Sequence, residues 1–272
     1  MSATMTGAAL NRLAPPRRPA TGAGAIIERN VLVYRRVWPL LASGLFEPVF
    51  YLFSIGVGVG SLIGQVTLTD GTAVDYRVFV APALLASAAM NGAIYDATFN
   101  IFFKLKYAKL YDAVLSTPMT VTDVAVGEIV WSLVRGALYA GSFLILMVAM
   151  GLALSWWVVL ALPAAILVGF AFGAAGMAGT TYVRAWPDFE WLQLIMLPMF
   201  LFATTFYPVT VYPRPLQIFV ECTPLYHAIE LIRGLSLGRV GFGLLPHIAY
   251  LAIMGLIGLT IAAKRLDRLL LT

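Results

Sequence analysis

Charge and cysteine are both scarce in this sequence. Asp, Glu, Lys and Arg make up 11% of its 272 residues, against about 25% in an ordinary soluble domain, whereas 61% of the residues are hydrophobic. The single cysteine, Cys222, excludes an internal disulfide framework and a metal site built on several cysteines. The two histidines, His227 and His247, lie far apart in the sequence with no carboxylate cluster beside them. We therefore expect no metal site and ordinary packing for both histidines.

Motifs for nucleotide binding and catalysis are absent as well. No Gly-x-x-x-x-Gly-Lys-Ser/Thr stretch occurs, so the chain has no phosphate-binding P-loop. The glycines of 56–60 lack that lysine and sit in an apolar run, where they favour close helix approach, as do Gly169, Gly173, Gly176 and Gly179. We expect a chain that binds no cofactor itself and has no catalytic residues.

Long apolar runs are what the sequence has in abundance. A helix needs about 20 apolar residues to cross about 30 Å of hydrocarbon, and several runs approach or exceed that length. We predict an all-α polytopic membrane protein without a cleavable signal peptide, since the N-terminal segment is rich in Pro, Arg and Ala and has no apolar core. The six predicted transmembrane helices, of which the fifth is short, are 38–63, 79–103, 124–150, 158–183, 191–207 and 244–263.

The basic residues indicate how these spans are oriented. Thirteen of the 18 Lys and Arg residues flank the spans on one side, which the positive-inside rule assigns to the cytoplasm. They are Arg12, Arg17, Arg18, Arg29, Arg35, Arg36, Lys104, Lys106, Lys109, Arg184, Lys264, Arg265 and Arg268. We predict a multi-pass protein of the plasma (inner) membrane with both termini cytoplasmic. Flanking of apolar spans is a membrane signal, so we expect no nucleic acid as a partner.

Three regions follow from this pattern. Residues 1–24 are rich in Ala, Pro, Thr and Arg, which indicates a disordered cytoplasmic tail. Residues 25–37 interleave apolar with charged side chains, as in an interfacial amphipathic helix, although a ragged start to the first span is the alternative. Residues 38–272 form the transmembrane domain.

The cytoplasmic loop after the second span predicts a short amphipathic helix within 104–122. At about 100° per residue, one arc carries apolar side chains and the opposite arc carries Lys106, Lys109, Asp112 and Ser116. The apolar arc consists of Tyr107, Ala108, Leu110, Tyr111, Val114 and Leu115. Such a helix either docks into a groove on a soluble partner or lies on lipid headgroups, and the pattern leaves both open.

The external segment 208–243 is too long for a tight turn. It contains helical pieces at 216–222 and 225–237, neither long enough to cross, so it is either a re-entrant helical pair or an ordinary loop. Within it, Glu230 and Arg233 are spaced to form an i, i+3 pair. The residues assigned to an external gate are Pro208, Pro224, Tyr226, Glu230 and Arg233.

Three charged residues fall inside the predicted spans, where each costs roughly 2.5–3.5 kcal/mol on insertion scales. They are Glu47, Asp96 and Arg135. We expect Glu47 and Asp96 to face the bundle interior, with one of them paired to Arg135. The alternative is that Asp96 and Glu128 approach the cytoplasmic interface and are solvated there.

Several stretches in order resemble the permease subunit of ABC-2 type exporters, most closely the nodulation-factor (NodJ-type) branch. The resemblance covers about 25–266. It rests on Phe46-Glu47-Pro48 with the glycine run 56–60, on 81–91 beginning Ala81-Pro82, on 111–118 beginning Tyr111-Asp112 with Gly127-Glu128, and on Phe206-Tyr207-Pro208 with 224–234.

This resemblance implies half of a transporter that moves an amphipathic substrate, such as a lipid-linked oligosaccharide, a glycolipid or a drug. Members of the family pair as dimers, here expected to be homodimers among membrane lipids, and associate with two cytoplasmic ATPase subunits that hold ATP and Mg²⁺. The loop helix would then couple to the ATPase, and the external helices would close the outer gate. An ATP-independent secondary transporter is the alternative, but no internal repeat supports it.

Overall fold

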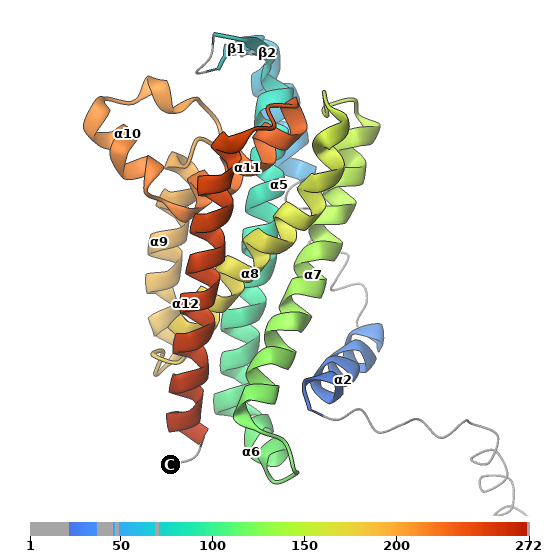
Figure 1. Cartoon of the computed structure of the whole chain (residues 1–272), viewed down its shortest axis with the longest axis vertical. Coiled ribbons are helices and arrows are strands. Elements are labelled where there is room, and N and C mark those ends of the chain that lie inside the picture. Colours follow the sequence, from blue (N-terminus) through green and yellow to red (C-terminus); the bar gives the residue numbers. More distant parts are fainter. Residues whose placement is uncertain (1–21, 37–45, 47–48, 69–70, 271–272) are drawn as a thin grey trace, which may run out of the picture.

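The computed structural model describes residues 22–36, 46, 49–68 and 71–270, and its helices run side by side along one long axis (Figure 1). Four continuous helical segments are long and apolar enough to cross a membrane. They are Tyr76–Tyr107, which contains α5 (Tyr76–Tyr95); Val121–Ala149, which is α7; Trp156–Thr180, which contains α8 (Ala161–Thr180); and Phe242–Leu269, which contains most of α12 (Leu245–Leu270).

The other two predicted spans are shorter or lie partly outside the described residues. Helix α9 (Phe189–Phe202) has 14 residues, which is fewer than the roughly 20 that a straight crossing requires, and contains Pro198. The first span is described only from residue 46, apart from 47–48, and ends in the π-helix Leu52–Val59 and α4 (Gly60–Ile63). The count of six spans therefore stays a prediction, while the helical membrane class is confirmed for the described part.

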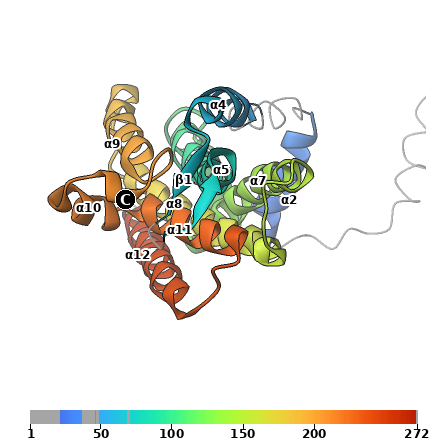
Figure 2. The same cartoon turned by 90° about the horizontal axis from the view of Figure 1, so that it is seen from above.

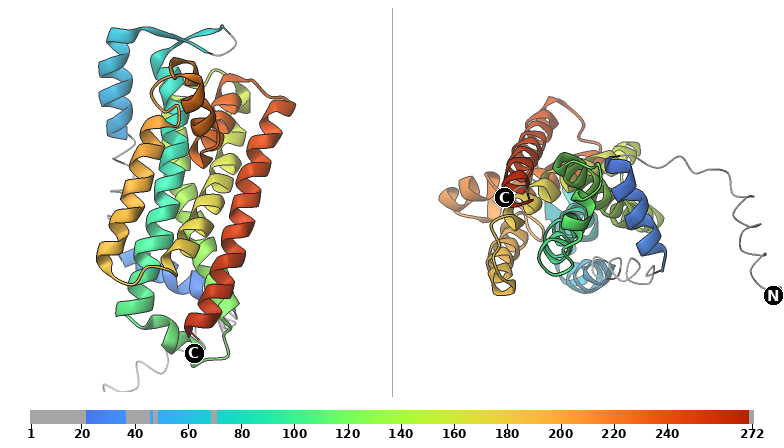
Figure 3. Two further views of the ribbon diagram at one scale, coloured as in Figure 1. Left: turned by 90° about the vertical axis from the view of Figure 1, so that its left-hand side faces the viewer. Right: turned by 90° about the horizontal axis from the view of Figure 1, so that it is seen from below.

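Elements far apart in sequence gather at the two ends of the bundle (Figures 1 and 3). The basic end holds α2 (Ala23–Arg36), α6 (Leu110–Leu115) and the last turns of α12. The opposite end, here called the hairpin end, holds the strands and α10 (Arg214–Glu221). The ends of α2 and α12 thus lie at the same end of the molecule, and this end is the one that the charge rule predicts to be cytoplasmic.

A short β-hairpin departs from the all-α prediction. Strands β1 (Gln65–Thr67) and β2 (Ala73–Asp75) pair antiparallel, with Val66 opposite Val74. Alternating polar and β-branched residues favour strand pairing, and Gly71 takes the positive φ of 83° that the turn needs. Asp75 then caps α5 by accepting a hydrogen bond from the Arg77 backbone N–H at 2.8 Å.

Helices α8 and α12 make the closest contact in the bundle. A Cβ atom built on Gly258 would lie 2.7 Å from backbone atoms of both Ala174 and Ala175, so no larger residue fits there. On other faces of α8, Gly173 and Gly176 approach α7 and the segment after α5, as their spacing predicted, whereas a Cβ on Gly179 would meet no atom within 4 Å.

Helix α11 (Pro224–Leu237) is a short helix buried inside the bundle. It packs against α5, α8 and α12 (Figure 2), and Leu225, Ile229 and Ile232 are fully buried. Gly238 ends it in the left-handed conformation with φ of 80°. Together α10 and α11 correspond to the predicted pieces 216–222 and 225–237. Of α10 only Val220 is buried, so a re-entrant helical pair stays a prediction.

Candidate coupling site and external closure

The loop helix expected within 104–122 is interrupted. The segment before it ends in a π-helix, Phe103–Tyr107, and Lys109 then adopts a positive φ of 44° before α6 begins. A π-turn is wider than an α-turn, and a left-handed residue reverses the backbone, so the two pieces do not share the single arc that the pattern predicted. The expectation of one continuous amphipathic helix is therefore wrong.

The apolar side of α6 faces the other helices of the same chain. Tyr111 is 1% exposed and joins the apolar core of the basic end, with Leu110, Val114 and Leu115 packed against it. In contrast, Tyr107 is 61% exposed, and the side chain of Asp112 lies outside what the structure describes. The surface that α6 and its flanks offer to a partner is consequently the more polar one, made of Lys106, Tyr107, Lys109, Ala113 and Ser116.

A buried ion pair lies directly beneath α6. The Nζ atom of Lys104 donates to both carboxylate oxygens of Glu128, at 2.7 and 2.9 Å, and Asn30 of α2 donates to the same carboxylate at 3.2 Å. All three side chains are buried. The pair ties the end of the α5 segment to α7 and α2, and sequence reasoning missed it because Lys104 had been counted only as a flanking charge.

Tyr111 connects this ion pair to α6. Burial, followed by the nearby Glu128 carboxylate, holds the pKa of the Tyr111 hydroxyl well above its ordinary value. The phenol therefore stays neutral at any physiological pH. Tyr111, which is 1% exposed, thus places α6 next to the Lys104–Glu128 pair.

A second buried ion pair lies further along the same helices. Arg135 on α7 pairs with Asp96, and its guanidinium also donates to the hydroxyl of Tyr34 on α2 at 2.7 Å. Asp96 accepts a further hydrogen bond from Asn100 at 2.8 Å, within the π-helix Asp96–Asn100. The pairing that the sequence left open is thus made by Asp96, whereas Glu47 lies outside the described residues.

The carboxylates of both ion pairs, Asp96 and Glu128, are shielded from solvent. Asp96 is 3% exposed and Glu128 is 2% exposed, so the alternative of acids solvated at the interface is wrong for both. Helix α2 contacts both ion pairs, through Asn30 and Tyr34, and it fits closely on α7 because a Cβ on Gly127 would lie 2.7 Å from Ile26. Burial, then the Asp96 carboxylate, raises the pKa of Tyr34 to about 12, so its hydroxyl remains available to Arg135.

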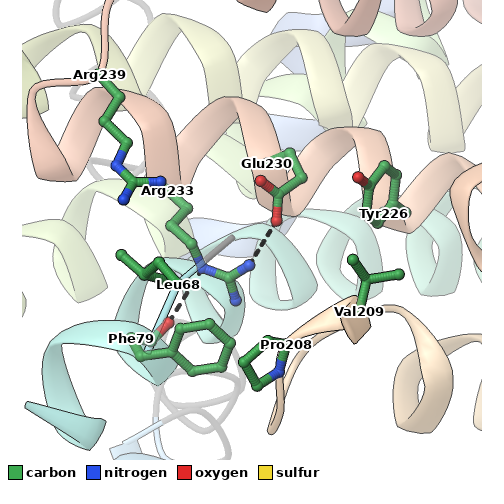
Figure 4. A pocket seen from close by; sticks show the side chains of 8 residues that line it. All are labelled: Leu68, Phe79, Pro208, Val209, Tyr226, Glu230, Arg233 and Arg239. Carbon is green, nitrogen blue, oxygen red and sulfur yellow. Dashed lines mark hydrogen bonds and ion pairs between the residues drawn. The ribbon is translucent and has the colours of Figure 1, made fainter. Parts of the chain in front are cut away.

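At the hairpin end, a buried arginine joins three elements, and Figure 4 shows its contacts with Glu230 and Phe79. Arg233 of α11 donates to Glu230 at 2.6 Å, to the backbone carbonyl of Thr204 at 2.7 Å, and to the carbonyl of Phe79 on α5 at 3.4 Å. Its guanidinium also lies 4.0 Å from the centre of the Phe79 ring. Thr204 follows α9 and has a positive φ of 64°, so Arg233 holds the chain where that helix ends.

The predicted gate residues surround this arginine. A small cavity of about 50 Å³ is lined by Pro208, Tyr226, Glu230, Arg233 and others, with Tyr226 and Glu230 on the same helix (Figure 4). Pro224 stands apart from that cavity, at the first position of α11, where a missing N–H costs nothing. The i, i+3 spacing predicted the Glu230–Arg233 pair, but nothing in the pattern indicated Thr204 as a partner.

The two histidines meet despite their separation in sequence. Their Nδ1 atoms are 2.7 Å apart, and the His227 ring stacks on Tyr250 with ring centres 4.0 Å apart. Among the described residues, no group of three or more His, Cys, Asp or Glu side chains is arranged to hold a metal ion. The contact joins α11 to the start of α12.

Four long apolar helices packed around a short buried helix are typical of a helical membrane protein. The ABC-2 type transporter family matches residues 21–237, and the chain belongs to that family. It is similar to nodulation protein J of Sinorhizobium fredii, with 33% identity covering 91% of this chain and 94% of the relative. Nodulation protein J of Rhizobium leguminosarum bv. viciae shares 32% identity with the same coverage. Nodulation protein J of Rhizobium meliloti also shares 32% identity, which covers 79% of this chain and 80% of the relative.

Family membership makes this chain the membrane-embedded transport subunit of an ABC exporter, which pairs with an ABC ATPase subunit. The resemblance drawn from the sequence is confirmed. The described helices agree with it, since they form an apolar bundle whose basic end carries a short helix on the surface.

Proposed function

We propose that this permease exports an amphipathic substrate, such as a lipid-linked oligosaccharide, a glycolipid or a drug, across the plasma membrane. Two copies of the chain form the pathway, and two cytoplasmic ATPase subunits bind ATP and Mg²⁺. This chain binds no cofactor and catalyses no reaction. Similarity to nodulation protein J supports a substrate of the nodulation-factor type.

The observation that supports this proposal is the packing of α6 against the rest of the chain through Tyr111. Tyr111 rests beside the Lys104–Glu128 pair, and that pair contacts the α5 segment, α7 and α2. When the ATPase subunits close on ATP, they push on Lys106, Tyr107 and Lys109 at the exposed side of the loop. Because the opposite side of α6 is buried against these elements, the push moves them together.

In this proposal, the contacts at the hairpin end keep the outer side of the transport pathway closed. Arg233 links α11 to α5 and to the end of α9, so the outer side stays closed while those contacts hold. Pro208 and Tyr226 line the cavity beside it and move with it. Opening requires that Thr204 and Phe79 separate from Arg233.

Reconstitution with the partner ATPase in proteoliposomes tests this mechanism. We expect Lys109→Glu with Tyr107→Ala to lower ATP-dependent transport of a fluorescent glycolipid at least about tenfold, the equivalent of about 1.4 kcal/mol of lost interaction. The unfolding midpoint should stay unchanged, because both residues are exposed. Arg214→Glu at the hairpin end, where the side chain is 71% exposed, is the matched control and should transport normally. Transport driven by a proton gradient without ATP would instead establish a secondary transporter.

A further inference from the structure

A groove of about 410 Å³ separates the middle of α9 from the rest of the bundle. Its walls come from the α5 segment, α8, α9, α12 and the first residue of α11, Pro224, and include Gly179 and Met254. Only Phe189 and Met196 of α9 are buried. The groove persists because both ends of α9 are attached elsewhere, through an aromatic cluster at Phe189 and through Arg233 beyond its last turn.

The walls of this groove suit hydrocarbon. The hydroxyls of Thr98 and Thr180 donate to carbonyls of their own helices, at 2.6 and 2.9 Å. The carboxylate of Asp188 accepts from the backbone N–H groups of Arg184 and Ala185, at 2.8 and 3.1 Å. The polar side chains that line the groove thus have partners, and the rest of the described lining is almost wholly apolar. A gap between membrane helices that offers no polar group is filled best by an apolar chain.

A positive charge lies just beyond the lining of the groove at the basic end, next to the lining residues Thr180 and Val183. Arg265 of α12 lies beside the last turn of α8, where its guanidinium is 4.1 Å from the centre of the Tyr182 ring and 3.5 Å from the carbonyl of Thr181. Its Nε atom is buried and has no hydrogen-bond partner. A ligand therefore cannot reach Nε itself, but the Arg265 side chain as a whole is only half-buried, so a phosphate can approach the part of the guanidinium that stays exposed.

Further basic residues adjoin this place. Arg184 follows Val183, which lines the groove, and Lys264 and Arg268 flank Arg265 on α12. The carboxylates on the same two segments, 183–190 and 264–268, are Asp188, Glu190 and Asp267, so these segments together carry a balance of plus one. Basic pockets between transmembrane helices on the cytoplasmic side are typical binding places for anionic lipid headgroups.

We propose that this groove binds one anionic phospholipid of the leaflet at the basic end. Its acyl chain lies between α9 and α8, and its phosphate accepts hydrogen bonds from Arg265 and Arg184. The lipid fills the space that α9 leaves open, and thereby supports a helix with few contacts of its own. This site is separate from the substrate of the proposed export function and does not depend on it.

Native mass spectrometry of the purified full-length permease tests the site. The protein is equilibrated with equal amounts of phosphatidylglycerol and phosphatidylcholine carrying identical acyl chains. We expect wild type to retain phosphatidylglycerol preferentially. Since a basic residue near the membrane surface contributes about 1 kcal/mol, Arg265→Gln should lower that preference roughly fivefold. Arg214→Gln, which removes an exposed charge at the hairpin end, should leave it unchanged.

A second variant tests the acyl chain. A side chain added at Gly179 enters open space, so Gly179→Phe should fill the groove and lower retention of both lipids, and Ala175→Phe repeats the test at another lining position. Ile145→Phe on α7, where the side chain is 72% exposed, is the matched control. Equal retention of the two lipids by wild type, unchanged retention by the folded Phe variants, or a retained molecule other than a phospholipid would each overturn the proposal.

Discussion

At the basic end, two buried ion pairs share one helix, because α2 contacts Glu128 through Asn30 and Arg135 through Tyr34. At the hairpin end, one arginine holds three elements, and two of its partners are backbone carbonyls. A network of side-chain pairs can shift one pair at a time, whereas a single hub either holds or releases all its partners together. The first suits gradual transmission of movement, and the second suits a closure with two states.

Removing the hub should have the largest effect. Arg233→Met leaves Glu230, whose side chain is 33% exposed, without its cation, and leaves the carbonyls of Thr204 and Phe79 without their donor. At about 1–3 kcal/mol for each lost hydrogen bond, the sum should be about 3–5 kcal/mol. We expect this loss in the free energy of unfolding of the purified permease, measured by denaturant titration. Arg214→Met, at an exposed position of the same end, should change stability by less than about 0.5 kcal/mol. Equal stability of the two variants would contradict the description of Arg233 as a hub.

The Lys104–Glu128 pair should show a smaller and partly recoverable effect. Lys104→Met leaves the Glu128 carboxylate buried with Asn30 as a remaining donor, so we expect a loss of about 2–3 kcal/mol. Adding Glu128→Gln removes the buried charge, and the double variant should be more stable than the Lys104→Met single variant. The coupling free energy from the double-mutant cycle should be about 1–3 kcal/mol, and a value near zero would mean that the two side chains do not interact.

Tyr34→Phe should have the smallest effect. It removes one hydroxyl that accepts a hydrogen bond from Arg135, while Asp96 still pairs with the guanidinium. We expect a loss of about 1 kcal/mol in unfolding free energy. Tyr107→Phe removes a hydroxyl from a side chain that is 61% exposed and should change nothing measurable. If Tyr34→Phe matched Arg233→Met in effect, the contrast between a distributed network and a hub would fail.

The local sequence pattern was sufficient to predict some structural features of this protein. Apolar run length predicted the four long helices, and proline positions with short apolar stretches predicted α10 and α11. Spacing predicted the Glu230–Arg233 pair. Each of these depends on residues close together in the chain, where helix geometry relates sequence to position directly.

Contacts between distant segments were harder to predict. Asn30, Lys104 and Glu128 come from three elements, and periodicity identifies the face of a helix without identifying what that face meets. The same limit explains α6, whose apolar arc was evident but was assigned to a partner protein, when the permease core covers it. The left-handed residues Lys109 and Thr204 gave no signal, since neither is a glycine or an asparagine.

The glycine contact between α8 and α12 limits how the protein can change shape. With a Cβ at Gly258 only 2.7 Å from the neighbouring backbone, and one at Gly255 2.3 Å from the Phe170 ring, these helices cannot rotate past each other without a steric clash. We therefore expect them to move together as one unit. During a transport cycle we expect the rearrangement in the elements around these two helices, such as α9, of which only Phe189 and Met196 are buried and which can move once the contacts at its ends are released.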